Sequence, residues 1–219
     1  MEGKSHLRFA KLAPFYDLGV RLCGFMLGGE ERVRRRVVDL LPLRGDEQIL
    51  EVGCGTGTVT LMLSRRLQQE GRAFGVDPSP QMLIRAQRKL RSAPLPAMFL
   101  QGSGDQLPFV DSSLDCVICF LSLHEMSHPD RIAALQESVR VLKPDGYLLI
   151  GELHCPSSSV GRFLLRLLLL VEEEEARDFF QRGLDRILRE AAGNRLQPVT
   201  TRLFAGGLGQ GLLLRKRSA

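Results

Sequence analysis

The sequence has no tryptophan and only two tyrosines, and aromatic residues make up 6% of its 219 residues. Charge of one sign is also scarce, since 30 Lys and Arg against 25 Asp and Glu leave a formal net charge of +5. A nucleic-acid-binding protein usually shows a concentrated basic face, often with aromatic residues that stack on bases. The composition therefore predicts no nucleic-acid partner. A hydrophobic content of 44% excludes a disordered or collagen-like chain.

Long hydrophobic runs are missing. The most apolar stretch, 163–171, has nine residues and is interrupted by Arg166, whereas a membrane-spanning helix needs about 20. The first twelve residues contain no apolar core followed by a cleavage site, so no export signal is expected. The sequence predicts a cytoplasmic protein with a peripheral membrane contact through 162–171.

The cysteines do not form an even disulfide framework, because there are five of them: Cys23, Cys54, Cys116, Cys119 and Cys155. Cys116 and Cys119 form a C-x-x-C pattern inside an apolar run that is typical of a buried strand. Side chains three apart on a strand point to opposite faces, so these two thiols cannot share one metal ion. We interpret them as core thiols in a reducing compartment.

Apolar strand-like segments alternate with amphipathic helix-like segments through the first two thirds of the chain. The predicted strands are 48–52, 73–77, 97–101, 114–120 and 147–153. The predicted helices are 29–41, 58–70, 79–92 and a helix that Pro129 opens and residues 143–146 stop. This alternation predicts a parallel sheet covered by helices on both faces, with right-handed crossovers.

The pattern changes after residue 153. A strongly apolar helix is expected at 157–171 and a charged one at 172–192, followed by strands at 196–204 and 208–216 around a glycine-rich turn. The predicted fold class is therefore α/β, a Rossmann-like, mostly parallel sheet of seven strands with an antiparallel C-terminal hairpin. A single domain over 1–219 is expected. Its parts are covering helices in 1–28, a cofactor-binding core in 29–153, an acceptor lid in 154–192 and the hairpin in 193–219.

A glycine-rich turn, E-V-G-C-G-T-G at 51–57, follows the first predicted strand directly. Glycines let the backbone turn sharply and let a ligand approach it, and ligands of open α/β sheets bind beyond the carboxyl ends of the strands. Asp77 ends the second strand, 24 residues after Gly53, where a carboxylate can accept hydrogen bonds from both hydroxyls of a ribose.

The residues of the same turn favour one of two cofactor classes over the other. A dinucleotide site needs a third glycine where Thr58 stands, and Glu51 would repel a pyrophosphate. A carboxylate suits a ligand that carries an ammonium and a sulfonium cation instead, and S-adenosylmethionine is that ligand.

Four stretches together resemble the class I S-adenosylmethionine-dependent methyltransferases: ILEVGCGTG, GVDPSPQML, GSGDQLPFVDSSLDCVI and RVLKPDGYLLI. They are most similar to the ubiquinone/menaquinone-biosynthesis branch and its small-molecule and lipid relatives. The upstream APFYDLGVRLCGFMLGG is also similar, so the resemblance runs from about residue 9 to 153. It implies methyl transfer from S-adenosylmethionine to a small-molecule or lipid-like acceptor, with S-adenosylhomocysteine as product.

The resemblance assigns each site residue a role. The loop residues that pack on the methionyl and ribose parts are Gly53, Cys54, Gly55, Thr56 and Gly57. Glu51 lies near the charged end of the cofactor and Asp77 binds the ribose. The remaining cofactor contacts are Pro78 and Met82 beside the adenine, Ser103 and Gly104 near its amino group, Phe120 and Leu121 on the pocket floor, and Tyr16 as a cover.

Two positions depart from the family pattern. Ser103 stands where the family commonly has an Asp, which implies a weaker or water-mediated adenine contact. Asp145 replaces the first glycine of the usual P-G-G turn, with little expected consequence.

Three histidines follow the fourth and fifth predicted strands, where the acceptor is expected. His124, His128 and His154 are therefore candidate general bases, with Glu152 and His154 as the favoured pair. His124 to His128 also match the H-E-x-x-H zinc signature, which needs both histidines on one helix. Pro129 favours an extended His128, so no metal site is expected.

Several alternatives stay open from the sequence. Glu51 could cap a structural network, Tyr16 could be a packing residue, each histidine could be structural, and 163–171 could be a core helix and not a lid. A non-catalytic S-adenosylmethionine-binding scaffold is an alternative to an enzyme. A nucleotide-dependent oxidoreductase is opposed by Glu51 and the missing glycine. Neither the acceptor nor the oligomeric state is indicated.

Overall fold

The computed structural model describes residues 30–68, 70–156, 158–159, 162, 165, 174–204 and 207–218. Its elements in chain order are α2 (Glu30–Val38), β1 (Gln48–Val52), α3 (Thr58–Ser64), β2 (Arg72–Asp77), α4 (Pro80–Ser92), β3 (Ala97–Gln101), β4 (Leu114–Phe120), the 3₁₀ helix η1 (Leu123–Glu125), α5 (His128–Val141), β5 (Leu142–Leu153), α7 (Glu174–Arg182), α8 (Leu184–Ala192), β6 (Leu196–Phe204) and β7 (Gly209–Lys216).

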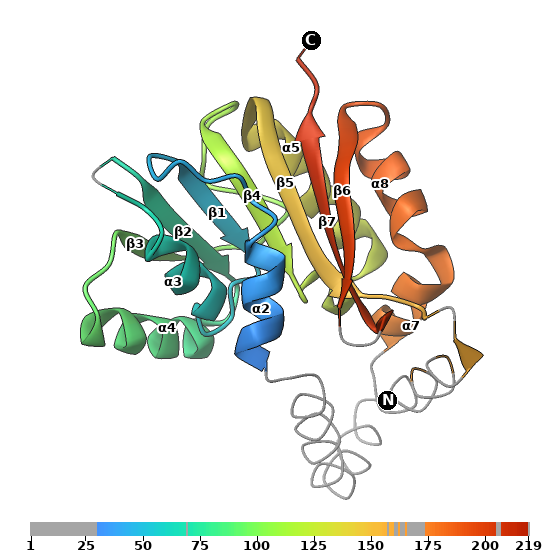
Figure 1. Cartoon of the computed structure of the whole chain (residues 1–219), viewed down its shortest axis with the longest axis horizontal. Coiled ribbons are helices and arrows are strands. Elements are labelled where there is room, and N and C mark those ends of the chain that lie inside the picture. The colour runs from blue at the N-terminus through green and yellow to red at the C-terminus, as the bar shows by residue number, and fades with distance from the viewer. Residues whose placement is uncertain are drawn as a thin grey trace, which may run out of the picture.

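The strands form one sheet of seven in the order β3-β2-β1-β4-β5-β7-β6 (Figure 1). The first five in this order are parallel, whereas β7 runs antiparallel to β5 and β6 antiparallel to β7. This confirms the predicted fold class. The strand order reverses between β1 and β4, because β2 and β3 lie on one side of β1, and β4 and β5 on the other. A ligand crevice is therefore expected at the carboxyl ends of β1 and β4.

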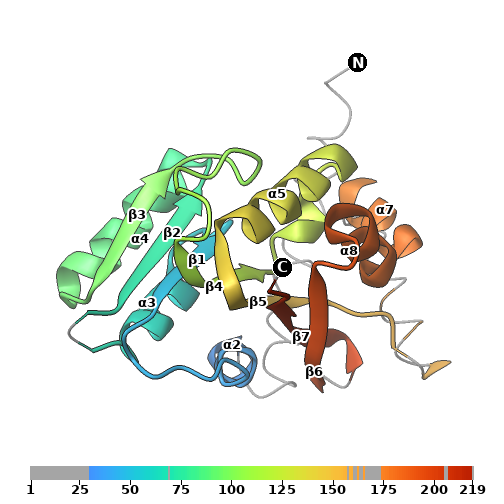
Figure 2. The same cartoon turned by 90° about the horizontal axis from the view of Figure 1, so that it is seen from above.

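Helices cover both faces of the sheet, with α2 and α3 on one side and α5 and α8 on the other (Figure 2). Alternate side chains of each strand pack into the hydrophobic cores on opposite faces of the sheet. In β1, Ile49 packs with α2 and α3, whereas Leu50 and Val52 pack on the opposite face with α5 and α8. Each fully buried aliphatic side chain of this kind contributes roughly 1.5–3 kcal/mol. The strands are thereby fixed in register, and their carboxyl ends are held at one edge.

The prediction that Cys116 and Cys119 are core thiols is confirmed, and the reducing compartment stays a prediction. Cys116 lies in the core on the α2 side and Cys119 in the core on the α5 side, and both are free thiols. Burial raises the pKa of each to about 12, so neither is a reactive thiolate at neutral pH. Cys23 and the segments 1–28 and 166–171 lie outside the described residues.

Several predicted boundaries are wrong, among them the end of α2, which lies at Val38 and not at 41. Helix α3 ends at Ser64 and not at 70, because the chain turns there and the Gln68 N–H donates to the Gly45 carbonyl at 2.7 Å. The predicted helix 172–192 is two helices, since Gly183 adopts φ +76° between α7 and α8. Strand β5 begins at Leu142, where it pairs with Leu114 before a bulge.

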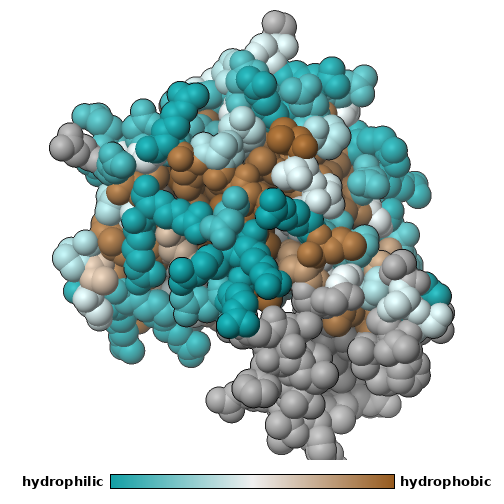
Figure 3. All heavy atoms as spheres, in the orientation of Figure 1, coloured by the Kyte–Doolittle hydropathy of each residue, from teal (hydrophilic) through white to brown (hydrophobic). Residues whose placement is uncertain are grey.

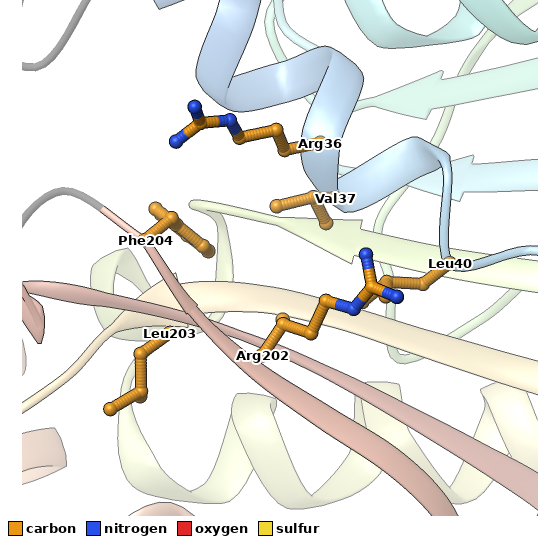
Figure 4. A pocket seen from close by; sticks show the side chains of 7 residues that line it. Arg36, Val37, Leu40, Arg202, Leu203 and Phe204 are labelled. Carbon is orange, nitrogen blue, oxygen red and sulfur yellow. The ribbon is translucent and has the colours of Figure 1, made fainter.

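One face of the molecule carries a small hollow on the α2 side of the sheet. Figure 3 shows hydrophilic residues across the middle of this face, with a band of hydrophobic residues above them. The hollow, of about 140 Å³, lies between α2 and the β6–β7 hairpin (Figure 4), and it is lined by Arg36, Val37, Leu40, Arg202, Leu203, Phe204 and Gly211. None of these residues belongs to the site predicted from the sequence. In the described part of the chain, no helix has the length and apolar character needed to cross a bilayer.

Substitutions at Asp145, which stands where the family's turn has glycine, test what its side chain contributes to stability. Asp145 adopts φ +64°, and its carboxylate binds Arg215 at 2.9 Å and accepts from Ser218 at 2.8 Å. Asp145→Ala keeps the left-handed backbone but loses these contacts, and should cost about 1 kcal/mol. Asp145→Gly loses the same contacts while relieving the backbone, so its free energy of unfolding should stay close to that of the wild type. Chemical denaturation of the two variants checks this, and equal destabilisation would contradict it.

Candidate active site

The glycine loop after β1 is bound to both neighbouring strands. The Gly53 and Cys54 N–H groups donate to the Val76 carbonyl of β2 at 2.9 and 3.0 Å. Gly53 adopts φ +71°, and a Cβ placed there would lie 2.6 Å from the Ser122 Cβ, just beyond β4. The Ser122 hydroxyl in turn donates to the Val52 carbonyl at 3.0 Å. Only glycine satisfies both the backbone conformation and this close approach at position 53.

Glycine at position 55 is explained by the backbone conformation and not by packing. It adopts φ +50°, but a Cβ placed there would have no atom within 4 Å. At Gly57, which has φ +71° and precedes α3, a Cβ would lie 2.4 Å from the Phe99 ring. Gly53 and Gly57 are thus required by packing, whereas the loop is open at Gly55. A ligand can approach the main chain there.

Lys89 of α4 holds the outer side of this loop, a role that sequence reasoning missed. Its ammonium donates to the Thr56 and Thr58 hydroxyls at 2.7 and 2.9 Å. Its position in the last turn of an amphipathic helix gave no signal, because a lysine there is usually explained by the helix dipole.

Asp77 ends β2 with its side chain buried against the loop. One carboxylate oxygen accepts from the Gly55 N–H at 2.7 Å and the other from the Ser79 N–H at 2.9 Å. A carboxylate offers about four acceptor positions, so each oxygen keeps capacity for a ribose hydroxyl. Asp77 therefore already positions the loop and the start of α4, and its contact with a ribose stays a prediction.

Glu51 is buried beneath the loop, on the α3 side of the sheet. Its Oε2 accepts from the Thr60 N–H at 2.7 Å and from the Thr60 hydroxyl, which fastens the first turn of α3 to β1. Burial raises the pKa of Glu51 to about 7, although the Thr60 hydrogen bonds and the charge of Arg34 act in the opposite direction. The structural reading of Glu51 is thus correct, and its predicted contact with a cation stays a prediction.

The adenine-side residues surround the end of β2. Pro78 is exposed, and the apolar Met82 side chain at the start of α4 is 38% exposed. Ser103 is exposed beyond β3, and a Cβ on Gly104 would lie 3.0 Å from both Val52 and Ala134. An exposed methionine and proline beside Asp77 leave an apolar surface on which a flat ring can stack.

The remaining predicted cofactor residues differ in accessibility. Cys54 is buried with Leu83 and Phe99, and burial raises the pKa of its thiol far above its usual range. Phe120 is buried at the end of β4, and Leu121 adopts φ +49° while its N–H donates to the Gly151 carbonyl at 2.8 Å. Tyr16 lies outside the described residues.

The three histidines have different surroundings. His124 Nδ1 lies 2.7 Å from Glu152 Oε2, and both side chains are buried. His128 Nε2 lies 3.1 Å from Glu190, while the His154 main-chain N–H donates to the Leu208 carbonyl. The Glu152 carboxylate binds His124 and not His154, and the catalytic role of the favoured pair, Glu152 and His154, stays a prediction.

The H-E-x-x-H match is split between two elements. His124 lies in η1, whereas α5 begins at His128 after the Ser127 N-cap. The expectation of an extended His128 is wrong, since Met126 and Ser127 carry the extended backbone. The two histidines bind different carboxylates, and the described residues contain no cluster of three metal-ligating side chains.

Arg131 is a further residue that sequence reasoning missed. It is fully buried, and it donates to the Leu123 and Met126 carbonyls at 2.8 and 2.7 Å. It also pairs with Asp178 of α7 at 3.1 Å and lies over the Phe179 ring. Arg131 therefore fixes the turn after β4 to α7. A buried arginine on an apolar helix stripe is the signal that could have indicated this role.

The edge formed by β1, β2 and β5 carries three buried carboxylates, Glu51, Asp77 and Glu152. Each accepts hydrogen bonds from the protein, so all three are stable without a ligand. With the open backbone at Gly55, this edge fits a cationic adenosyl ligand and disfavours a pyrophosphate.

Comparisons with known proteins show the family to which this chain is related. The family described as "Methyltransferase domain" matches residues 49–146. The demethylmenaquinone methyltransferase of Thermus thermophilus is 36% identical over 73% of this chain and 70% of its own length. The ubiquinone/menaquinone biosynthesis C-methyltransferase UbiE of Pseudomonas paraeruginosa is 33% identical over 69% of this chain and 59% of its own length. A crystal structure of an S-adenosylmethionine-dependent methyltransferase from Aquifex aeolicus superposes with TM-score 0.66 at 20% identity, covering 84% of this chain and 89% of that one.

Gly55→Ala separates ligand binding from folding. The alanine meets no atom but must adopt φ +50°, so it should cost about 1 kcal/mol of stability. It should weaken S-adenosylmethionine binding by roughly tenfold or more, because its methyl group fills the open approach. Gly193→Ala is the control for backbone strain away from the loop, since Gly193 also has a positive φ (+55°) and an open surrounding beyond α8, although its ψ of −125° makes alanine more strained there. Calorimetric titration of both variants checks this, and equal affinities would contradict the assignment.

Glu51 should make stability depend on pH. Its folded pKa of about 7 exceeds the ordinary 4.5, so the folded protein keeps a proton that the unfolded chain has lost in this interval. The free energy of unfolding should therefore fall by up to about 3 kcal/mol between pH 4.5 and 7 from this group alone. Glu51→Gln should remove that slope, whereas Gln in place of the exposed Glu70 should keep it. Urea denaturation across this range measures both, and an unchanged slope in Glu51→Gln would refute the prediction.

Proposed function

Because this chain belongs to the family of S-adenosylmethionine-dependent methyltransferases, we propose that it methylates a lipophilic, quinol-type aromatic acceptor. The supporting observation is that one relative described above is named for demethylmenaquinone and the other for ubiquinone and menaquinone biosynthesis. The chain spans 70% and 59% of their lengths, and the acceptor is therefore proposed and not transferred outright.

The acceptor side of the site is proposed to lie beyond β4 and β5. There the rings of His124, Phe179 and Phe180 pack edge to face, with centroids 6.5 Å apart in the first pair and 5.7 Å in the second. Phe179 is buried and Phe180 partly buried, so this aromatic cluster continues the apolar core toward the sheet edge. Such a wall suits a flat aromatic ring better than a small polar amine.

S-adenosylmethionine supplies a methyl group on a sulfonium, and the electron pair of the broken C–S bond stays on sulfur in S-adenosylhomocysteine. The residues of the chain are assigned the remaining tasks. Asp77 orients the ribose and the main chain at Gly55 admits the methionyl part. The Asp77 carboxylate favours the positive charge, as does Glu51 in its ionised form. The methyl donor is already activated, so the main requirement is the alignment of donor and acceptor. The buried edge of the sheet is proposed to exclude water from the acceptor.

A cytoplasmic, reducing environment is proposed for the enzyme. Cys54, Cys116 and Cys119 are free and buried, and none of them is paired. A lipophilic acceptor would be reached at a membrane surface, for which the sequence predicts a contact through 162–171. Most of that segment lies outside the described residues.

A labelled transfer assay tests the proposal. The wild-type protein is incubated with methyl-labelled S-adenosylmethionine and a reduced, short-tailed demethylmenaquinol, and label should enter the extracted quinol. The same ring with its methyl group already in place is the control and should take up no label. Binding of S-adenosylmethionine without transfer to any naphthoquinol or benzoquinol would contradict the proposed acceptor.

A further inference from the structure

We propose that His124 accepts the proton of the acceptor's hydroxyl group at its Nε2 atom, and that Glu152 is the residue that positions it. This inference rests on the proposed function, because a quinol offers an ionisable hydroxyl beside the ring carbon that is methylated. The observation that supports it is a buried histidine–carboxylate pair at the carboxyl ends of two adjacent strands.

Glu152 fixes His124 through hydrogen bonds that use the whole carboxylate. Glu152 is fully buried, and its Oε1 accepts from the Ser122 and Leu123 N–H groups at 3.0 and 2.7 Å. Its Oε2 lies 2.7 Å from His124 Nδ1. A carboxylate accepts hydrogen bonds and does not donate them, so Nδ1 carries the hydrogen and the lone pair of the neutral ring lies on Nε2. The pair therefore presents the tautomer that a general base needs.

The turn that bears His124 is held rigidly. The Arg131 guanidinium, fully buried, donates to the main chain on both sides of His124, at Leu123 and Met126. The ring edge of His124 meets Phe179 of α7. The same turn begins at Ser122, whose Cβ defines the close approach to Gly53 of the cofactor loop. His124 thus lies one short turn away from the predicted methyl donor, on the side of the aromatic cluster.

The charged and titratable groups around His124 come from β5, α5, α7, β4 and η1 itself. Glu152 lies on β5, Arg131 on α5, and Asp178 on α7, where it pairs with Arg131 and Arg182. Cys119 on β4 is a buried thiol, and Glu125 next to His124 is exposed. Arg131 is paired with Asp178, and Glu152 is a charge in direct contact with the ring. An imidazolium formed at His124 would be stabilised by it.

The proton transfer balances without any further reactant. The O–H bond of the quinol breaks, its electron pair stays on oxygen, and an N–H bond forms at His124 Nε2. The ring carbon, enriched in electrons by the oxyanion, bonds to the methyl group and then loses its own hydrogen as a proton. The imidazolium returns its proton to the oxygen of the methylated product, which restores the hydroxyl and the neutral ring, so the proton from the ring carbon is the one released to solvent in each turnover.

His124→Asn tests the base without removing the structural contact. The Asn side-chain nitrogen lies where Nδ1 lay and can still donate to Glu152, whereas the atom equivalent to Nε2 is lost. At neutral pH, kcat should fall by roughly 100-fold or more, with KM for the quinol and affinity for S-adenosylmethionine nearly unchanged. The loss should shrink as pH rises toward the pKa of the quinol, because the acceptor then ionises in solution.

Glu152→Gln tests the positioning role. Its amide would donate to Nδ1, which moves the hydrogen of the neutral ring to Nε2, so kcat should fall while the main-chain bonds to the side-chain oxygen persist. Glu190→Gln is the matched control, because it alters the carboxylate that binds His128 and should leave kcat unchanged. Nitrogen-15 shifts of the imidazoles read the tautomer without any acceptor. They should show Nδ1–H at His124 in the wild type and Nε2–H in Glu152→Gln.

The outcomes are distinct. Wild-type protein that methylates a quinol while His124→Asn keeps kcat within about threefold would overturn the inference and leave the proposed function intact. An Nε2–H tautomer at His124 in the wild type would overturn it as well. If the wild type methylates no quinol, the proposed function fails and this inference fails with it.

Discussion

The site depends on a set of hydrogen bonds that join the tips of three parallel strands. The Asp77 carboxylate accepts from the Gly55 N–H, the Val76 carbonyl accepts from Gly53 and Cys54, and the Ser122 hydroxyl donates to Val52. These bonds hold the glycine loop open before any ligand arrives. Because the loop backbone is fixed in advance, binding does not require it to be ordered, which is the condition for tight and aligned binding.

Buried acidic groups make the same edge selective for charge. Glu51, Asp77 and Glu152 would each be costly to bury without donors, and each has main-chain donors supplied by the fold. A cation placed among them is favoured, whereas a pyrophosphate is repelled. The carboxylates that hold α3, α4 and η1 in place are therefore the same ones that favour an adenosyl sulfonium ligand.

The sequence predicts much of this arrangement, for identifiable reasons. The bounds of β1 and β3 coincide with the prediction because their apolar runs are short and end at polar or glycine residues. The bounds of β4 coincide as well, although the apolar Leu121 follows it. The positions of the glycine loop and of Asp77 follow from their places after strands. The end of α3 could not be predicted, because it depends on a bond from Gln68 to Gly45 in another loop. The partner of Glu152 could not be predicted either, since His124 is 28 residues away and meets it only through the pairing of β4 with β5.

A crystal structure of the protein with S-adenosylhomocysteine tests the central claim most directly. The account predicts both ribose hydroxyls within hydrogen-bond distance of the Asp77 carboxylate, with the ligand chain crossing the main chain at Gly55. Ligand density elsewhere, or an Asp77 that keeps only its bonds to Gly55 and Ser79, would contradict it.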